Sequence, residues 1–559
     1  MTNRNTIFTT ILLVLACFGL LPGAQAVSPP PDGGYPNFNT AEGQNALFSL
    51  TTGSANTAVG WFSLWGNATG EFNTALGAGT LLFNTADENT ATGAGALLSN
   101  TTGTGNLADG AFALFSNTEG GSNTAVGDGA LFSNTTGSVN TATGTGALFS
   151  NTTGGGNTAN GVDALFSNTT GNLNTANGVD ALVNNTEGGG NTANGSDALF
   201  SNTAGILNTA NGVSALFSNT TGGFNTATGS NALTGNTTGF NNTATGSNAL
   251  LRNTTGGGNT ANGFEALKNN TEGFSNTANG VNALVNSTTG ILNTATGNGA
   301  LLSNTTGENN TANGVDALSS NTTGGGNTAN GVSALFSNTT GNSNTAIGGG
   351  ALFHNTTGSV NVAVGDFAGG NLTTGDVNID ILNPGVAGET NTIRIGVTQT
   401  QTFIAGISGQ TASGGAAIFV NSDGKLGTFN SSARFKDEIK PMGKASEAIL
   451  GLKPVSFRYK KEIDPQRIPQ FGLVAEEVEK VNPDLIIRDP KGKPHMVRYE
   501  QINAMLLNEF LKEHRKVQAL EKGMAAVTAQ LKEQAAQIQK VSAHLEMSKP
   551  TTKVVLNNP

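Results

Sequence analysis

Cysteine is almost absent from this chain: Cys17 is the only one. It lies in a segment typical of a secretory signal, where Arg4 precedes apolar residues 7–21 and a small-residue cleavage site ends at Ala26. Cleavage there would leave a mature chain without cysteine, which excludes disulfides and thiolate metal sites. We therefore predict a signal peptide over residues 1–26 and a secreted or cell-surface protein.

Two other interpretations of this leader stay open. If it is retained, it would be a membrane anchor, although its apolar run is short for a membrane span. The run Val14-Leu15-Ala16-Cys17 also resembles a lipoprotein box, but apolar residues continue beyond the cysteine.

Charge is scarce too, at 11% of residues, and it is divided unevenly. Up to residue 378 the only cations are Arg4, Arg252 and Lys268, so 24 of the 27 Lys and Arg lie in the last 181 residues. This distribution leaves no basic stripe along the first two thirds, and we predict no nucleic-acid partner. Low charge and 79 glycines would suggest disorder, but the net charge is only −10 and Ala, Leu and Phe recur in register.

Twenty tandem copies of one 17-residue unit fill residues 39–377, after a lead over residues 27–38. The copy at Asn157 reads N-T-A-N-G-V-D-A-L-F-S-N-T-T-G-N-L, and only the copy at Asn73 is one residue short. We number the unit 1–17 from its first asparagine. Because so short a unit cannot fold alone, neighbouring units must stack. The repeat therefore predicts an elongated rod, with any chemistry lying outside it.

Each unit contains two short runs, N-T-A-x-G at positions 1–5 and A-L-F-S-N at positions 8–12. Each run is long enough for one strand, with glycine at the positive-φ corners. We predict a mostly β fold, in which a parallel β-roll or β-solenoid has Ala and one Leu per coil inside. At a strand spacing of about 4.8 Å, twenty coils would extend roughly 95 Å.

Position 10 adds an apolar stripe, which association of several rods would cover. Its phenylalanines include Phe48, Phe132, Phe149, Phe166, Phe200, Phe217 and Phe336. From residue 39 to about 380 the units resemble the left-handed parallel β-roll heads of trimeric autotransporter adhesins, whose motif also centres on Ala-x-Gly. The resemblance implies a homotrimer with a display role, and a surface receptor or glycan as a possible partner.

The Asn-Thr-Thr triplets at positions 12–14 match the N-glycosylation acceptor pattern many times. Their recurrence at one fixed position favours turn chemistry instead, in which Asn and Thr bond their own backbone and stack in ladders. The threonine rows could also order water, as in ice-binding solenoids, but the invariant pair adjoins the glycine corner instead of lying mid-strand. No copy carries enough Asp for a calcium-binding roll.

The period is lost from Ile379 onward. Two alternating apolar sets follow, bounded by glycine or polar residues, and predict strands of a β neck or linker over residues 378–430. The sets are Ile393, Ile395 and Val397, and then Phe403, Ala405 and Ile407.

An ordinary globular composition begins at Ser431 with the run S-S-A-R-F-K-D-E-I-K-P. It continues with L-K-P-V-S-F-R-Y from Leu452, F-G-L-V-A-E-E-V from Phe471 and V-R-Y from Val497. This order resembles the intramolecular chaperone auto-processing domain at the C-terminus of endosialidase-type phage tail spikes and tail-fibre-like proteins. We assign such a small α+β domain to residues 431–500.

In that family the domain trimerises, drives folding of the β-rich fibre before it, and cuts itself off before the motif serine. The resemblance implies a serine peptidase that acts once on its own chain, with Ser431 as nucleophile, Lys436 as base and Asn430–Ser431 as the scissile bond. The family pattern reads Ser-Asp-x-Arg-x-Lys, and here Ser432 replaces the Asp. Ser432 is also a rival nucleophile, and Ser432 and Arg434 are possible supporting residues.

The proposed chemistry needs no metal and no small-molecule cofactor. A serine hydroxyl attacks the carbonyl before it, a neutral amine takes the proton, and water opens the resulting ester. A separation of five places Ser431 and Lys436 on opposite faces of a strand or a helix. A turn must therefore lie between them, or a partner chain must supply one of them. The alternative is that Ser431 caps a helix and Lys436 is a solvated charge.

A helix over residues 501–547 is predicted next, followed by a disordered tail over residues 548–559. Its residues follow the 3-4 spacing of a heptad seam that only Glu513 and Gln534 interrupt, which favours a coiled coil over a single helix folded back on the domain. The seam consists of Leu506, Phe510, Glu513, Val517, Leu520, Met524, Val527, Leu531, Gln534, Ile538, Val541 and Leu545.

Together these features predict an exported trimeric fibre or adhesin-like surface protein. Its C-terminal chaperone domain would direct trimer folding and release itself at Asn430–Ser431. The alternative is a structural adhesin that is never cut, in which the C-terminal domain is only a trimerisation clamp.

Overall fold

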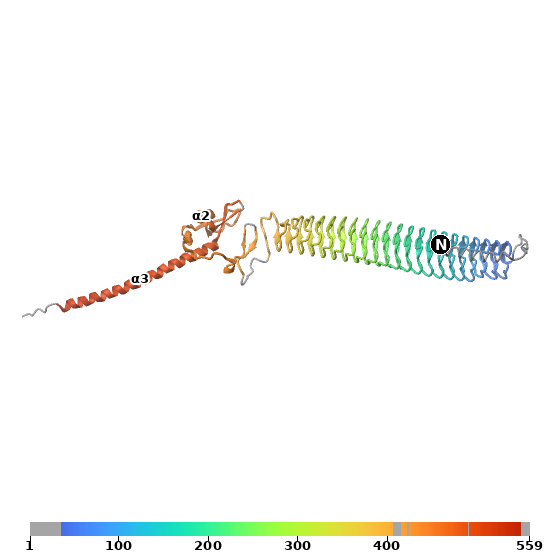
Figure 1. Ribbon diagram of the computed structural model, residues 1–559, viewed down its shortest axis with the longest axis horizontal. Coiled ribbons are helices and arrows are strands. Elements are labelled where there is room, and N and C mark those ends of the chain that lie inside the picture. Colours follow the sequence, from blue (N-terminus) through green and yellow to red (C-terminus); the bar gives the residue numbers. More distant parts are fainter. Residues whose placement is uncertain (1–34, 406–414, 422–423, 490, 549–559) are drawn as a thin grey trace, which may run out of the picture. The chain divides into compact units, whose positions relative to one another are not determined.

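The computed structural model describes residues 35–405, 415–421, 424–489 and 491–548. The predicted signal peptide, Cys17, Ile407 and all but the first residue of the predicted tail lie outside these residues. The chain divides into two compact units, Met1–Thr402 and Phe403–Pro559. The first unit is a solenoid of stacked coils and the second contains a long helix, α3 (Figure 1). Among the described residues no helix is long and apolar enough to cross a membrane.

The solenoid has one short strand per coil, at positions 2–4, after a 3-10 helix, η1 (Pro36–Phe38). Successive strands pair in parallel and in register, for example Thr158 with Thr175 and Ala159 with Ala176, so one sheet runs the length of the unit. Its strands are β1 (Thr40–Glu42), β2 (Thr57–Val59), β3 (Thr74–Leu76), β4 (Thr90–Thr92), β5 (Leu107–Asp109), β6 (Thr124–Val126), β7 (Thr141–Thr143), β8 (Thr158–Asn160), β9 (Thr175–Asn177), β10 (Thr192–Asn194), β11 (Thr209–Asn211), β12 (Thr226–Thr228), β13 (Thr243–Thr245), β14 (Thr260–Asn262), β15 (Thr277–Asn279), β16 (Thr294–Thr296), β17 (Thr311–Asn313), β18 (Thr328–Asn330), β19 (Thr345–Ile347), β20 (Val362–Val364), β21 (Ile379–Ile381) and β22 (Ile393–Ile395).

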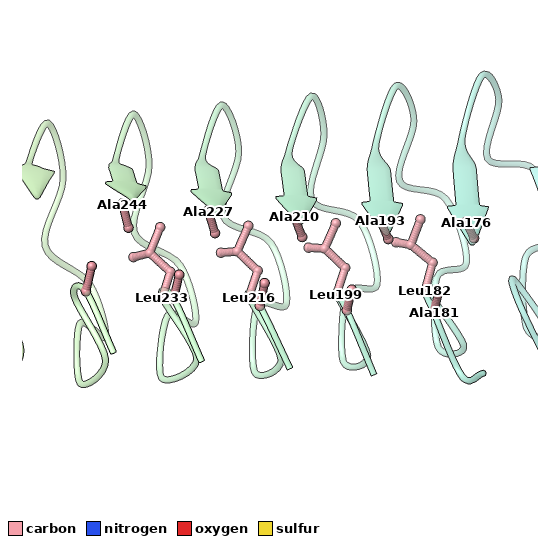
Figure 2. Close-up of a cluster of buried hydrophobic side chains, with 14 of the residues drawn as sticks. Ala176, Ala181, Leu182, Ala193, Leu199, Ala210, Leu216, Ala227, Leu233 and Ala244 are labelled. Carbon is pink, nitrogen blue, oxygen red and sulfur yellow. The ribbon is translucent and has the colours of Figure 1, made fainter. Parts of the chain in front are cut away.

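The core consists of three stacked columns, formed by the alanines at positions 3 and 8 and the leucine at position 9. In a typical coil Ala159, Ala164 and Leu165 are fully buried. Figure 2 shows the leucines of successive coils stacked directly on one another, with the strand alanines facing them. The mostly β solenoid predicted from the repeat is therefore confirmed.

The second strand predicted at positions 8–12 is wrong. Ala164 and Leu165 are adjacent and both point inward, which an alternating strand cannot do. Leu165 has φ 55°, in the left-handed region, so the chain turns there. The turn is closed by Asn168, whose backbone N–H donates to the Leu165 carbonyl at 3.1 Å.

Glycine at position 5 is required by both conformation and space. Gly161 has φ 144°, and a Cβ on it would lie 2.4 Å from the carbonyl oxygen of Gly178 in the next coil. A side chain here would therefore force adjacent coils apart.

Two columns of buried asparagines, at positions 1 and 12, tie the coils together. Asn174 donates from its backbone N–H and from Nδ2 to Oδ1 of Asn157, at 2.9 and 3.2 Å. Asn185 donates from Nδ2 to Oδ1 of Asn168 at 2.8 Å. Both Asn174 and Asn185 also donate to the carbonyl of Gly188 in their own coil, at 2.8 and 2.9 Å. Each amide therefore braces its coil internally and joins it to the coil before.

The Asn-Thr-Thr triplet is a structural turn. Asn168 is fully buried, so it is not accessible as a glycan acceptor in the folded solenoid. The carbonyl of Thr186 accepts the backbone N–H of Thr169, Thr170 and Gly171 from the coil before, and the Thr169 hydroxyl donates to it as well, at 3.0 Å. The prediction of turn chemistry over glycosylation is confirmed.

Most phenylalanines of position 10 are buried or half-buried, because they stack on each other along the solenoid, whereas Phe48 in the first coil is 68% exposed. Ring centroids in adjacent coils lie 4.9 to 5.2 Å apart with nearly parallel planes, which is close to the strand spacing. The stacked pairs are Phe115–Phe132, Phe132–Phe149, Phe149–Phe166, Phe200–Phe217 and Phe336–Phe353. Part of the cover that we expected from other rods is thus supplied within the chain.

The parallel sheet continues beyond residue 377, where we placed the start of the neck. Ile379 pairs with Val362, and Ile393 pairs with Ile379, so β21 and β22 are two further layers of the solenoid. The alternation of apolar and polar residues is inverted in these two layers. Isoleucines lie at the outward positions, and Asp380 and Arg394 stand in the alanine column. No strand forms at residues 403–405.

Asp380 is a buried carboxylate at the end of the core. It is 1% exposed, and neither of its oxygens has a hydrogen-bond partner among the described residues. Arg394, its neighbour in the next layer, is instead paired with Glu389 at 2.8 Å. Burial, and then the negative charge of Glu389, raise the pKa of Asp380 to about 6, while Arg394 opposes the shift.

The second unit is small and mixed. It contains the antiparallel pairs β23 (Phe419–Val420) with β24 (Leu426–Gly427), β25 (Val455–Phe457) with β26 (Gln470–Gly472), and β27 (Ile486–Arg488) with β28 (Pro494–Val497). Its helices are η2 (Ala433–Phe435), η3 (Gly443–Gly451), α2 (Ala475–Val481), η4 (Pro483–Leu485) and α3 (Tyr499–Met547). The predicted long helix is confirmed as α3. Among the described residues of this unit, the buried apolar cluster consists of Val478, Leu485, Ile486 and Met505.

A natural gap in the asparagine ladder generates the first prediction. Ser287 replaces asparagine at position 12, and its hydroxyl and Oδ1 of Asn270 have no partner in the described structure. We expect Ser287→Asn to restore the ladder and stabilise the solenoid by roughly 1–3 kcal/mol, seen as a higher urea midpoint. The matched control is Ser303→Asn at position 11, where Asn286 shows that asparagine is tolerated. Equal midpoints for both variants would contradict the role of the ladder.

Asp380 generates a pH prediction for the last coils. The folded chain keeps a proton between pH 3.8 and about 6 that the unfolded chain has released, so stability falls as pH rises through this window and stays lower above it. The loss should be roughly 1–3 kcal/mol once solvent screening is allowed for. Asp380→Asn should abolish the dependence in amide exchange of residues 379–395, and Asp366→Asn, at an exposed carboxylate, should keep it. Unchanged pH dependence in Asp380→Asn would contradict this assignment.

Candidate processing site and the C-terminal domain

The predicted scissile bond lies in an exposed, irregular segment between β24 and η2. The segment follows the β23–β24 hairpin, where the rings of Phe419 and Phe429 lie 4.2 Å apart. Asn430 and Ser431 are exposed and belong to neither a strand nor a helix. A bond in this setting can be reached without unfolding any element, as cleavage requires.

One turn separates the two predicted catalytic residues. Ser432 precedes the single 3-10 turn η2 with extended backbone, and Lys436 follows it. The turn is closed by the backbone N–H of Lys436, which donates to the carbonyl of Ala433 at 3.1 Å. The five-residue separation of Ser431 and Lys436 thus includes one turn, which is what the two residues would need to meet within one chain.

The Ser431 and Lys436 side chains are not joined in the single chain. Neither makes a hydrogen bond, ion pair or ring contact within the described residues, and both are exposed. The Arg434 guanidinium lies 4.6 Å from the centroid of the Phe435 ring, a cation–π contact. The roles of Ser431, Ser432, Arg434 and Lys436 stay predictions.

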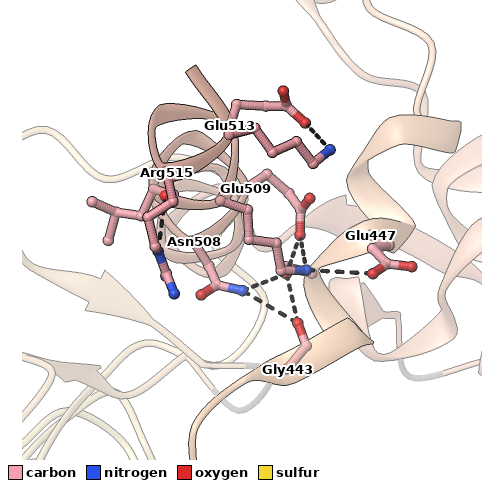
Figure 3. Close-up of polar contacts among 10 residues, drawn as sticks. Gly443, Glu447, Asn508, Glu509, Glu513 and Arg515 are labelled. Atoms are coloured by element: carbon pink, nitrogen blue, oxygen red, sulfur yellow. Dashed lines mark hydrogen bonds and ion pairs between the residues drawn. The ribbon is translucent and has the colours of Figure 1, made fainter. Parts of the chain in front are cut away.

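A second serine–lysine contact lies deeper in the domain, where η3 packs against α3. Ser446 is fully buried, and its hydroxyl donates to Oε1 of Glu509 and accepts from Nδ2 of Asn508 at 2.6 Å. Nζ of Lys512 lies 3.3 Å from the same hydroxyl and 2.6 Å from Glu509. Figure 3 shows Asn508 and Glu509 of α3 facing Gly443 and Glu447 of η3.

The electrostatics of this cluster do not suit catalysis. The hydrogen bond that Lys512 donates to Glu509 raises the pKa of Lys512, and Glu447, 3.4 Å away, favours the charged amine further. A protonated lysine cannot take a proton from serine, and Ser446 is shut off from solvent. Ser446, Asn508, Glu509 and Lys512 therefore form a structural clamp between η3 and α3. We call these four residues the η3–α3 clamp.

Sequence reasoning missed this clamp. The Glu509–Lys512 pair has the i,i+3 spacing of an ordinary surface ion pair, and Ser446 stands 62 residues before Asn508 with no motif around it. Only the packing of η3 on α3 brings them together.

An apolar groove of about 600 Å³ lies next to the clamp. It is open to solvent and its lining includes Leu452, Val455, Phe471, Tyr499, Ile502 and Leu506. Phe471 is 86% exposed, and the Tyr499 hydroxyl accepts the backbone N–H of Leu473 at 2.9 Å, which fixes one wall. Among the described residues no group of three His, Cys, Asp or Glu could hold a metal ion.

Residues 431–487 match the model of a peptidase family described as "Chaperone of endosialidase". The match begins at the predicted nucleophile and includes η2, η3, β25, β26, α2 and η4. It confirms the resemblance predicted for the C-terminal domain. Neither a curated protein nor a solved structure matches the chain.

The clamp generates a prediction. Ser446→Ala removes a buried hydroxyl that both Asn508 and Glu509 contact, so the η3–α3 packing should lose about 1–3 kcal/mol. The loss should appear as a lower unfolding midpoint of the second unit by circular dichroism. Ser456→Ala, at an exposed position on β25, is the control and should change little. If self-processing occurs, it should persist in Ser446→Ala, and its loss with the fold retained would contradict a purely structural role.

Proposed function

We propose that the protein is an exported homotrimeric fibre whose C-terminal domain templates trimer folding and then cuts itself off. The chaperone-of-endosialidase match, at the end of a long solenoid, supports a trimeric fibre-type protein with a C-terminal chaperone. The observation that carries the proposal is the open apolar surface of this domain and its helix.

The first step is oligomerisation through α3. Beyond Met505 no residue of the helix is buried, although its apolar residues repeat with heptad spacing. A single chain thus leaves a long apolar seam in water, which partner helices would cover. The exposed apolar residues of the seam are Leu506, Phe510, Val517, Leu520, Met524, Val527, Leu531, Ile538, Val541 and Leu545.

The apolar groove extends this surface onto the domain itself. Leu506 belongs to both the groove and the seam, so the two form one continuous apolar surface. In the part of this unit that the structure describes, the buried apolar cluster contains four residues, which is little for a unit of this length. Association of three copies would supply the missing burial.

The second step is a single self-cleavage. The Ser431 hydroxyl attacks the Asn430 carbonyl, and Lys436 takes the hydroxyl proton and returns it to the leaving amine of Ser431. The resulting ester is opened by water, which leaves a carboxylate on Asn430 and a free N-terminus on Ser431. Because Lys436 is exposed and makes no contact with Ser431 in the single chain, we propose that assembly buries the lysine and completes the pair, within one chain or between two.

If cleavage required assembly, the C-terminal domain could not be lost before it had acted as a template for folding. A dyad that exists only in the trimer cannot cut before the chains are aligned. The predicted signal peptide would direct the chain to the cell surface or beyond, where the solenoid could engage a receptor or glycan.

The alternative is a structural adhesin that is never cut, in which the C-terminal domain is a permanent trimer clamp. The exposed seam and groove support both functions equally, since each requires a trimer. Only the fate of the Asn430–Ser431 bond separates them.

Denaturing electrophoresis of the purified mature chain tests the cleavage. We expect two bands, one of them a fragment of 129 residues (559 − 430) whose first residue is Ser431. Ser431→Ala should give one full-length band and still form trimers by light scattering, while Ser432→Ala, the control next to it, should still cleave. A single full-length band in the wild-type trimer would favour the uncut adhesin, and a wild-type monomer would contradict both functions.

A further inference from the structure

Two threonine columns run along the solenoid, and the structure uses them differently. At position 13 the hydroxyls are engaged within the protein: Thr220 donates to the carbonyl of Thr237 and Thr237 to that of Thr254, at 3.1 and 3.0 Å. At position 2 the hydroxyls of Thr209, Thr226 and Thr243 have no hydrogen-bond partner in the described part of the chain. The solenoid does not need this second column for its own hydrogen bonding.

The position 2 column lies mid-strand on a regular surface. In each strand the alanine at position 3 faces the core, so positions 2 and 4 both face outward. In-register pairing sets Thr226 on Thr243 and Thr228 on Thr245, and the strands of successive coils lie side by side (Figure 2). We call the outward residues of β7 to β18, from Thr141 to Asn330, the threonine face.

The chemistry of the threonine face is uniform. Every residue at position 2 is threonine, every residue at position 4 is threonine or asparagine, and none is charged. Each threonine presents a methyl and a hydroxyl group, repeated every 4.8 Å or so by the strand spacing. Charged residues do enter these columns outside the face, at Glu42 and Asp109.

A neutral array of this kind has no feature that would recognise a single solute. The polar groups of the face carry no charge, so a small molecule would gain only one or two weak hydrogen bonds from it. A ligand that is itself periodic would gain the same small contribution at every coil, and the contributions sum because the array is rigid. Water held in a lattice is such a ligand, since it donates and accepts hydrogen bonds at regular intervals and can order around methyl groups.

We propose that the threonine face binds ice. The face does not include the threonine pair at positions 13 and 14, which adjoins the glycine corner. The proposal does not depend on self-cleavage or on the chaperone role of the C-terminal domain. It requires only that the face stays open to water in the assembled protein.

The test uses the full mature chain and ice as the probe. Ice is grown slowly from a solution of the protein mixed with serum albumin, and the fraction of each protein inside the ice is measured. The variant Thr209→Lys/Thr226→Lys/Thr243→Lys places bulky charges on the face. Its matched control, Thr221→Lys/Thr238→Lys/Thr255→Lys, puts the same charges on exposed position 14 threonines of the same three coils.

The wild type and the position 14 control should be enriched in the ice, while the face variant should be excluded like albumin. A second face variant, Thr209→Leu/Thr226→Leu/Thr243→Leu, guards against misfolding, because Leu107 already occupies this column in β5. It should keep the wild-type circular dichroism and also lose ice partition. Exclusion of the wild type from ice, or equal partition of all variants, would overturn the proposal. Dissociation of the oligomer by the face variants would also overturn it, since the face would then be a contact between copies, as would binding to microcrystalline cellulose without binding to ice.

Discussion

The buried asparagine amides are the constraint on which the solenoid depends. An apolar interior of two alanines and one leucine per coil is too thin to fix the path of a coil by packing alone. Asn174 and Asn185 meet at the carbonyl of Gly188, which closes their coil, and each also reaches the equivalent asparagine of the coil before. Because a buried amide without partners is costly, this arrangement selects one register and one coil length.

In such a solenoid each coil is stabilised only by the coils next to it. Folding therefore depends most on how the first coil forms and on how the two end coils are capped. The first coil must order its backbone before any ladder can form, and its stacking partners are supplied by chain that is still disordered. A domain that aligns three chains lowers this entropic cost and is no longer needed once the coils have stacked. The single chain of the C-terminal domain, with an exposed seam on α3 and an open apolar groove, has the surface that such a template requires.

Much of the solenoid could be predicted because nearly every coil has the same residue types at the same positions. The columns of Ala159 and Leu165 were visible as invariant small and apolar residues in a fixed period. The second strand failed because the adjacent pair Ala164-Leu165 points inward as a turn, and the positive φ of leucine has no sequence signature. The layers at β21 and β22 were missed because polar residues replace the core alanine there. For the candidate processing site the sequence supplied the residues and the need for a turn, whereas the η3–α3 clamp rests on contacts between distant segments that no local pattern reports.

We propose that the solenoid needs the C-terminal domain to fold but not to stay folded. The most direct measurement is light scattering and circular dichroism on residues 27–430 expressed alone, beside the same residues obtained by proteolytic removal of the C-terminal domain from the folded full-length Ser431→Ala protein. We expect the chain expressed alone to be aggregated or monomeric, and the chain trimmed after folding to remain a β-rich trimer. If residues 27–430 fold unaided into the same trimer, the template role is contradicted.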